Sequence, residues 1–316
     1  MKLNSDSPYK ATSVLVTGAS GFIGSHLCRH LSKLGAQVTG AYLSNIPNGD
    51  DAEWLRLDLT DLDAVRKAIH EIRPDFTFHL AGSVQGCREL DAVVPTFENN
   101  LTSTIHILVA AQEAGCCKRL VITNSQEEPE RGDPKAVPAS PYAASKFASS
   151  AYARMFNALY GFPVVIARVF MVYGPEQKDH NKLVPCTILQ ALDGKAPELS
   201  SGVRRIDWVY VSDVVEGLLR LGSKSGIEGQ TIDLGTGQTH TIKATVEEIL
   251  NQIDPTLEGN FGAVPDRIME QEPIADIEET MARVGWRAQV SLKEGLARTI
   301  AWYREYRAGN LLTKAE

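Results

Sequence analysis

The fold is decided by the stretch VLVTGASGFIG, residues 14–24. A short apolar run leads into three glycines, and apolar residues then recur at helical spacing over residues 22–34 until Gly35 ends the pattern. In such a strand–turn–helix unit the first glycine permits the tight turn, the second admits a pyrophosphate, and the third lets the helix pack on the strand. The stretch predicts a dinucleotide-binding turn made by Gly18, Ser20, Gly21, Phe22, Ile23 and Gly24.

Apolar strands and helices alternate after this unit. We expect strands at 37–43, 76–80, 119–123 and 164–170, and helices at 62–72, 98–114 and 142–160. Strands without polar alternation indicate a parallel sheet covered on both faces, so the fold class is α/β. The pattern loosens after residue 171. We therefore place a first domain at 1–171 and a smaller mixed lobe at 172–316, with some segments crossing back to the first.

Composition limits the class of protein. The 316 residues carry a formal net charge of -7, with 43% hydrophobic and 22% charged residues, as in a globular protein. The acidic balance argues against a nucleic-acid partner. No apolar run reaches the ~20 residues of a membrane span, and no signal-peptide core precedes the first strand. Five cysteines without framework spacing indicate reduced thiols. We expect no membrane association and a cytoplasmic location.

The end of the second strand usually distinguishes NAD from NADP. A carboxylate there commonly accepts the ribose hydroxyls, but this chain has Tyr42, Leu43 and Ser44. Ser44 or Asn45 has the polar side chain to hydrogen-bond a 2′-phosphate, although no basic residue lies beside them in sequence. The expected cofactor is NAD or NADP, with the choice open. Asp58, next to Leu59, follows a third strand and either holds the adenine amino group or caps a turn.

A proton-transfer pair stands at the start of the helix expected at 142–160. Tyr142 and Lys146 are four residues apart, so their side chains share one face. An ammonium beside a phenol favours the phenolate and lowers the tyrosine pKa toward neutrality. Such pairs are common on solvated helices. The pair is informative here because it accompanies the glycine turn.

These motifs resemble the extended short-chain dehydrogenases that modify nucleotide-sugars, the NAD-dependent epimerase/dehydratase family, over nearly the whole chain. The resemblance implies a Rossmann doubly wound sheet, a carboxy-terminal substrate lobe, a bound NAD(P), and a homodimer through helices 98–114 and 142–160. HLAG at 79–82 is similar to the family strand that lines the cofactor, and NNL at 99–101 to the segment that stabilises it. The cofactor contacts so implied are Leu80, Ala81, Gly82, Tyr142, Lys146 and Val169.

The same resemblance places a catalytic hydroxyl at Ser125, opposite Tyr142. Glu127, two residues later, resembles the carboxylate that serves dehydratases and decarboxylases as a base, although some reductases also carry an acid there. The Asp-Glu pair of the thymidine-diphosphoglucose dehydratases is Gln126-Glu127 here, which argues against that activity. The implied catalytic residues are Ser125, Glu127, Tyr142 and Lys146.

The second lobe carries the motifs expected to hold a nucleotide-sugar. Met171 replaces the usual asparagine in RVFMVYGP at 168–175, and Ile206 replaces the usual arginine in RRIDWVYV at 204–211. Since alternate residues of a strand share a face, Arg204 is preferred as the diphosphate ligand. The expected substrate contacts are Ser83, Ser125, Met171, Lys182, Leu183, Val184, Arg204 and Arg267. No histidine, cysteine or carboxylate cluster has metal-ligand spacing, and no metal is expected.

The sequence therefore predicts an enzyme that oxidises the sugar of a nucleoside-diphosphate sugar transiently, for epimerisation or dehydration. One alternative is an NADPH-dependent reductase of a nucleoside-diphosphate 4-keto-6-deoxy sugar. Another is a dehydrogenase of a non-nucleotide carbonyl compound. A further alternative is a non-catalytic dinucleotide-sensing protein, against which the intact Ser125, Tyr142 and Lys146 argue.

Overall fold

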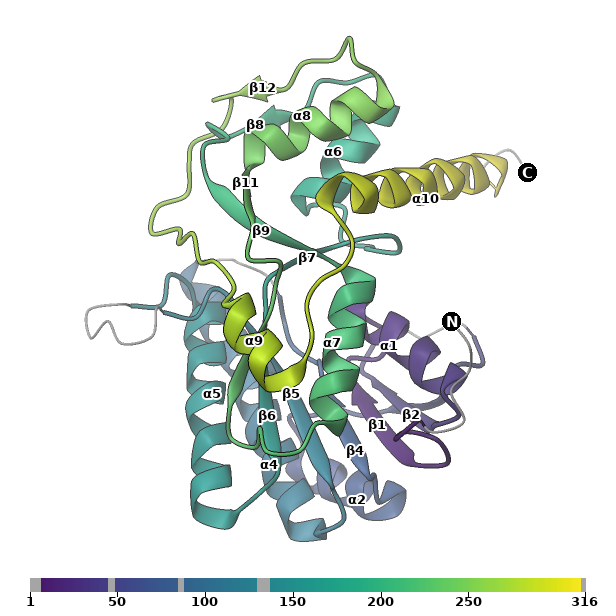
Figure 1. The fold of residues 1–316 in the computed structure, drawn as a ribbon, viewed down its shortest axis with the longest axis vertical. Helices are drawn as coiled ribbons and strands as arrows, with labels where there is room; N and C mark the ends of the chain where they lie inside the picture. Colours follow the sequence, from purple (N-terminus) through teal and green to yellow (C-terminus); the bar gives the residue numbers. More distant parts are fainter. Residues whose placement is uncertain (1–6, 45–48, 85–87, 130–136, 314–316) are drawn as a thin grey trace. The chain divides into compact units, whose positions relative to one another are not determined.

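The computed structural model describes residues 7–44, 49–84, 88–129 and 137–313 (Figure 1). The chain forms two compact units. Unit 1 comprises residues 1–169, 215–233 and 278–286, and unit 2 comprises residues 170–214, 234–277 and 287–316. Two later segments thus return to the first unit. Each unit is described by itself below.

A seven-stranded sheet forms the centre of unit 1, in the order β10-β6-β5-β4-β1-β2-β3. All pairings from β3 through β6 are parallel. This order and direction confirm the expected Rossmann-type sheet. The strands are β1 (Ser13–Thr17), β2 (Gln37–Tyr42), β3 (Glu53–Arg56), β4 (Phe76–His79), β5 (Arg119–Ser125), β6 (Val164–Val169) and β10 (Thr231–Leu234).

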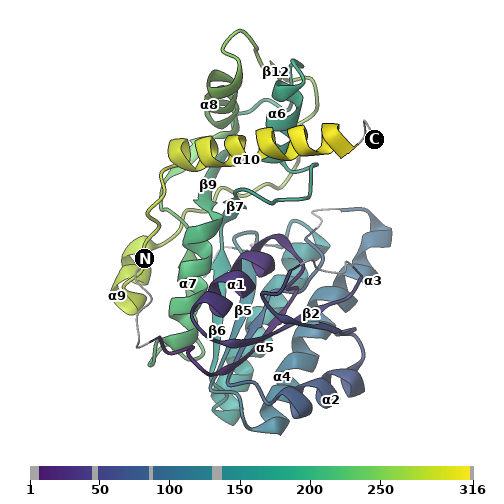
Figure 2. The same ribbon diagram turned by 90° about the vertical axis from the view of Figure 1, so that its right-hand side faces the viewer.

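Helices cover both faces of this sheet. Figures 1 and 2 show α1 on one face and α2, α4 and α5 on the other. Buried aliphatic side chains from β5, β6, α2 and α4 fill the space beneath the second group. The helices of this unit, two of which begin in unit 2, are α1 (Phe22–Lys33), α2 (Leu62–Ile72), η1 (Leu90–Ala92), α3 (Val93–Thr96), η2 (Phe97–Thr102), α4 (Ser103–Ala114), α5 (Pro141–Tyr160), α7 (Val211–Ser223) and α9 (Ile277–Val284).

The helix expected at 98–114 is not one regular α-helix. Its first turns are the π-helical segment η2, and regular α4 begins only at Ser103. The hydroxyls of Ser103 and Thr104 donate to the carbonyls of Asn99 and Asn100, at 2.6 and 2.7 Å. Such side-chain donors compete with the backbone ladder of a helix, a local effect that apolar periodicity does not register.

Unit 2 combines small sheets with three longer helices. Its sheets have the orders β11-β9-β7 and β12-β8, and α6, α8 and α10 pack together. The strand expected at 204–211 is β9, with Arg204 just before it. The elements are β7 (Met171–Tyr173), α6 (Leu183–Leu192), β8 (Glu198–Leu199), β9 (Arg205–Tyr210), β11 (Thr239–Thr241), α8 (Ile242–Ile253), β12 (Asn260–Phe261) and α10 (Leu292–Thr313).

The length and polarity of the helices bear on membrane association. Among the residues that the structure describes, no helix combines the length and the apolar character that a bilayer crossing requires.

Candidate active site

The glycine turn joins β1 to α1, and close packing explains two of its glycines. Gly18 adopts φ +66°, and a Cβ there would lie 2.7 Å from the backbone nitrogen of Ala81. A Cβ on Gly24 would collide with the carbonyl oxygen of Gly18. Any larger residue would therefore push α1 and the Leu80–Ala81 backbone away from the turn.

The amino terminus of α1 is open to an anion. Gly21 caps it in an extended conformation, and its own N–H donates to the carbonyl of Gly18 at 3.0 Å. The first turn contains no acidic residue, and its N–H groups have no acceptor within the helix. Ser20, Phe22 and Ile23 flank or form this turn. Their positions fit the expectation that this end of the helix faces a pyrophosphate.

A buried histidine ties β1 to β4 beneath the turn. His79 Nδ1 lies 2.8 Å from Thr17 Oγ1, and His79 Nε2 lies 3.1 Å from Thr104 Oγ1. Since the Thr104 hydroxyl donates to the Asn100 carbonyl, it accepts from His79, which puts the proton on Nε2. Burial, aided by the charge of Lys146, lowers the pKa of His79 to about 3. The ring is therefore neutral and structural.

Asn100 clamps the segment that follows β4. Its Oδ1 accepts from the Ser83 N–H at 2.6 Å, while its Nδ2 donates to the Ser83 carbonyl at 3.0 Å and to Ser145 Oγ at 3.2 Å. A Cβ on Gly82 would lie 2.8 Å from Asn100 Oδ1. The expected cofactor contacts Leu80, Ala81 and Gly82 are thereby held between the glycine turn and the helix that carries Lys146.

The structure brings Ser125, Tyr142 and Lys146 together. Ser125 ends β5, and its side chain is hydrogen-bonded to the Tyr142 phenol. Lys146 Nζ donates to the Thr123 carbonyl at 2.7 Å and lies 5.9 Å from the centroid of the Tyr142 ring. Ser140 caps α5 by accepting from the Ala143 N–H at 3.1 Å, which fixes the turn that carries Tyr142. Two elements thus position all three side chains.

The electrostatics of this group differ from the expectation for an isolated Tyr-Lys pair. Burial raises the pKa of Tyr142, the charges of Glu127 and Glu128 raise it further, and the hydrogen bond from Ser125 opposes them. Burial lowers the pKa of Lys146 to about 8, against the opposing charge of Glu128. Burial thus opposes the predicted lowering of the tyrosine pKa in the protein alone, and that lowering stays a prediction for the complex with cofactor.

The backbone of Glu127 contacts the catalytic group at Ser125. Its N–H donates to Ser125 Oγ at 3.1 Å, which leaves the Ser125 hydroxyl proton for another acceptor. Val169 pairs with Ser125 across β6 and β5, and its carbonyl accepts from the Gln126 N–H at 3.1 Å. The turn after β5 is thus held from both sides.

Where the adenosine of the cofactor is expected to bind, strand pairing brings Arg56 of β3 beside the end of β2, which local sequence spacing did not indicate. Tyr42 pairs with Arg56 across β2 and β3, and Arg56 Nε donates to the Leu43 carbonyl at 3.3 Å. Ser44 is exposed in the same segment. Arg56 was missed because only strand pairing, and no local spacing, brings it to this position.

Asp58 forms a turn with Thr60. Its Oδ1 accepts from the Thr60 N–H at 2.9 Å and from the Thr60 hydroxyl at 2.7 Å, and these bonds lower its pKa. Leu59 packs its side chain against the core of unit 1. This geometry is the turn alternative that the sequence left open, and the adenine contact stays a prediction.

Most of the expected substrate residues lie in unit 2. Met171 begins β7 and pairs with Trp208 of β9. Lys182 caps α6, so the N–H groups of Leu183 and Val184 belong to its open first turn. That turn has the amides and the neighbouring lysine expected of a diphosphate contact.

The two arginines proposed for the diphosphate differ in their surroundings. Arg204 Nη1 pairs with Glu270 at 2.5 Å, and its Nε and Nη2 donate to the Gln271 carbonyl at 3.4 and 3.2 Å. Arg267 is exposed, and its guanidinium pairs with no residue that the structure describes. Arg267 is therefore the more available cation of the two, since Arg204 would have to exchange its partner for a ligand.

Three further polar residues near the site were not predicted from the sequence to be buried. Asn124, Glu128 and Ser150 are buried and hydrogen-bonded to one another beside the catalytic helix. Nothing in their spacing marks them as interior, since each is ordinary on a surface. Among the described residues, no three histidine, cysteine or acidic side chains form a group that could hold a metal ion.

Comparisons with known proteins agree with this geometry. The model of the "NAD dependent epimerase/dehydratase family" matches residues 14–235. A UDP-glucose 4-epimerase of Mycolicibacterium smegmatis is 31% identical, over 92% of this chain and 98% of its own. A probable dTDP-glucose 4,6-dehydratase of Sinorhizobium fredii is 29% identical, over 92% and 93%.

A solved structure has a similar fold. It is the UDP-glucose 4-epimerase of Thermus thermophilus in complex with NAD, with a TM-score of 0.78, 29% identity, and coverage of 92% of this chain and 98% of its own. The family match covers both the glycine turn and the Ser125, Tyr142 and Lys146 group. This chain belongs to the NAD dependent epimerase/dehydratase family.

Proposed function

We propose that the protein is a nucleotide-sugar 4-epimerase that oxidises its sugar transiently. The observation that carries the proposal is the convergence of Ser125, Tyr142 and Lys146 at the end of β5 and the start of α5. Gln126 replaces the acid that the dehydratases carry at this position, and its relative from Mycolicibacterium smegmatis is a UDP-glucose 4-epimerase. Both facts favour epimerisation over dehydration.

The residues support a simple proton path. Bound NAD+ supplies the hydride acceptor, with the glycine turn, Leu80, Ala81, Gly82 and Val169 as its proposed contacts. Tyr142 Oη is the proposed acceptor of the sugar hydroxyl proton, for which it must be a phenolate. The positive charges of Lys146 and bound NAD+ would therefore have to offset the burial that raises the pKa of Tyr142. Because Ser125 Oγ accepts from the Glu127 N–H, it has one proton to donate, which would move from Tyr142 to the developing carbonyl oxygen when the substrate binds.

The cofactor and substrate assignments rest on different supports. NAD is proposed over NADP because the family is NAD dependent and a 29% identical structure holds NAD. Arg56 beside Leu43 keeps a 2′-phosphate chemically feasible, so the dissociation constants of both cofactors need to be measured. Ser83 in unit 1 and Met171, Lys182, Leu183, Val184, Arg204 and Arg267 in unit 2 are the proposed substrate contacts. Unit 1 is accordingly the proposed dinucleotide-binding domain and unit 2 the substrate lobe.

We propose a homodimer through α4 and α5, in the cytoplasm. Large apolar side chains are exposed on α5, Leu159 by 67%. Arginine at Leu159 is expected to give monomers by sedimentation velocity, because a charge would be buried in the interface. Arginine at Ile268, exposed by 75% in unit 2, is the matched control and should leave the mass unchanged. A dimeric Leu159→Arg protein would contradict this interface.

The cysteines within the described residues are free, which fits the proposed location in a reducing compartment.

The reaction is tested by incubating the protein with UDP-glucose and NAD+ and identifying the product by NMR. We expect the C4 epimer of the sugar, with no net consumption of cofactor. A 4-keto-6-deoxy product would mean dehydration, and net NADPH oxidation with a 4-keto sugar would mean reduction. Either result would replace the epimerase assignment.

A further inference from the structure

A buried carboxyl group lies in the turn after β5, outside the proposed catalytic group. The Glu128 side chain is 8% exposed. Its Oε2 accepts from the Ser150 hydroxyl at 2.8 Å, whereas its Oε1 accepts no hydrogen bond from any residue that the structure describes. A carboxylate in an interior is costly unless it is paired, so a purely packing role would be better served by an apolar side chain.

Hydrogen bonds connect this carboxyl group to the catalytic helix. Asn124 Nδ2 donates to Ser150 Oγ at 2.5 Å and to the Lys146 carbonyl at 2.8 Å. Asn124 is the residue before Ser125 in β5, and Ser150 lies one helical turn after Lys146 in α5. We infer that Glu128 is a positioning residue, which through Ser150 and Asn124 locks the register of α5, and with it Tyr142 and Lys146, against Ser125.

The Glu128 charge also acts on the proton-transfer pair. Its carboxylate favours the ammonium form of Lys146 and disfavours the Tyr142 phenolate. Burial raises the pKa of Glu128, and hydrogen bonds from the Ser150 hydroxyl and the Ser125 backbone, with the charges of Arg168 and Lys146, oppose that rise. The charged and titratable groups around this network are Glu127, Tyr142, Lys146, Arg154, Arg168 and His79, with Asp233 paired to Arg168 and Glu279 paired to Arg283.

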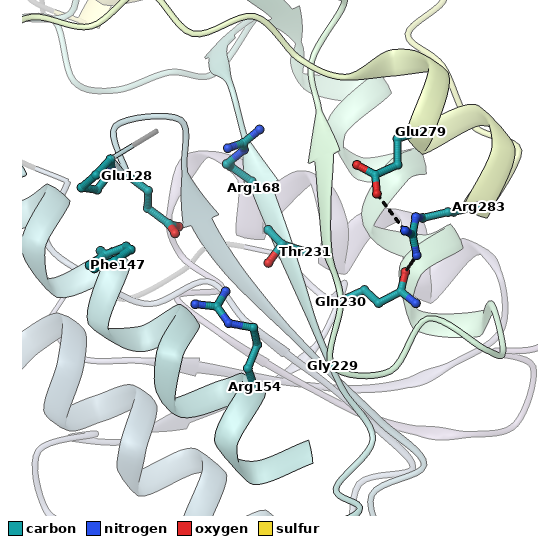
Figure 3. A pocket seen from close by; sticks show the side chains of 10 residues that line it. Glu128, Phe147, Arg154, Arg168, Gly229, Gln230, Thr231, Glu279 and Arg283 are labelled. Atoms are coloured by element: carbon teal, nitrogen blue, oxygen red, sulfur yellow. Dashed lines mark hydrogen bonds and ion pairs between the residues drawn. The ribbon is translucent and has the colours of Figure 1, made fainter. Parts of the chain in front are cut away.

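Glu128 also lines a cavity within unit 1. The cavity has a volume of about 480 Å³ and is lined by residues of the β5 turn, α5, β6, β10 and α9. In Figure 3 the Glu128 carboxyl group and the Arg154 guanidinium project into it from opposite sides. The Oε1 atom is itself closed off from solvent, so the Glu128 charge acts on the catalytic pair through the protein interior, where charges are weakly screened.

The electrostatic half of the inference is tested without substrate, by NMR of 13Cε-labelled lysine in the full chain. Lys146 should titrate near pH 8, apart from surface lysines that titrate at about 10.4, and Lys146→Met identifies its signal. Glu128→Gln preserves shape and hydrogen bonding, so we expect it only to lower that midpoint, by about one pH unit. Glu279→Gln, the same change on another carboxylate of the cavity, should leave the midpoint in place. An unchanged midpoint in Glu128→Gln would overturn this half.

The positioning half rests on the proposed function and is tested on turnover of UDP-glucose. Ser150→Ala removes the hydrogen bonds that link Glu128 to Asn124 but keeps the Glu128 charge. We expect kcat to fall roughly tenfold, with KM and NAD+ affinity unchanged, because misplaced catalytic groups slow chemistry more than binding. Equal kcat in Ser150→Ala and wild type would overturn the inference. An inactive wild type would instead refute the proposed function and leave the lysine titration as the test.

Discussion

At the residue scale, Gly24 leaves no room for a side chain against the backbone of the glycine turn. Its missing Cβ lets α1 meet the Gly18 carbonyl, so Gly24→Ala must displace the helix that would bind the pyrophosphate. We expect a loss of about 1–3 kcal/mol in the free energy of unfolding, with weaker NAD+ binding by calorimetry.

The matched control for this change is Gly309→Ala. Gly309 also lies in a helix, but a Cβ there would meet no atom within 4 Å. Alanine should therefore stabilise α10 by up to about 1 kcal/mol and leave NAD+ affinity unaltered. Equal NAD+ affinity in Gly24→Ala and wild type would remove the packing argument for the turn.

At the scale of elements, the first turn of α5 couples local helix stability to the site. Ser140→Ala removes the acceptor of the Ala143 N–H and should cost about 1 kcal/mol, together with a several-fold lower kcat, because Tyr142 occupies that turn. Thr241→Ala removes the equivalent cap of α8, at the Ala244 N–H, in unit 2. We expect the same loss of stability from it in chemical denaturation, with kcat retained. A comparable fall of kcat in both variants would refute the specific role of the α5 cap.

Sequence patterns predicted most strands and helices before residue 171 to within a few residues, because the spacing of apolar residues follows burial. The later elements of unit 1, α7, β10 and α9, were not predicted individually. The glycine turn and the Tyr142/Lys146 pair depend on local spacing and were equally accessible. Three features were not: the π-helical turns of η2, the Arg56 position beside Leu43, and the buried Glu128. Each depends on contacts between elements distant in sequence, or on side chains that compete with the backbone, and neither leaves a periodic trace.

At the scale of the whole molecule, His79 links folding to pH. Its pKa is about 3 in the folded state, against 6.5 for an exposed histidine. Below pH 6.5 the unfolded chain therefore binds a proton that the native state does not, and stability falls as the pH drops toward 3. Between pH 6.5 and 4.5 this single group should remove about 2 kcal/mol.

The histidine contribution is isolated by comparing wild type with His79→Gln in urea at both pH values. The variant is less stable at pH 6.5, since bonds to Thr17 and Thr104 are weakened, but its stability should decline less on acidification. Identical pH dependence in the two proteins would show that His79 is not held neutral in the native state.

The central claim is that Tyr142 exchanges the proton during hydride transfer to bound NAD+, and a single-turnover experiment tests it most directly. Protein loaded with NAD+ is mixed with UDP-glucose, and the absorbance of the reduced nicotinamide is followed in wild type and Tyr142→Phe. We predict transient reduction in wild type and a rate lower by roughly 10²–10⁴-fold in the variant, with NAD+ affinity preserved. Reduction at the wild-type rate in Tyr142→Phe would contradict the account.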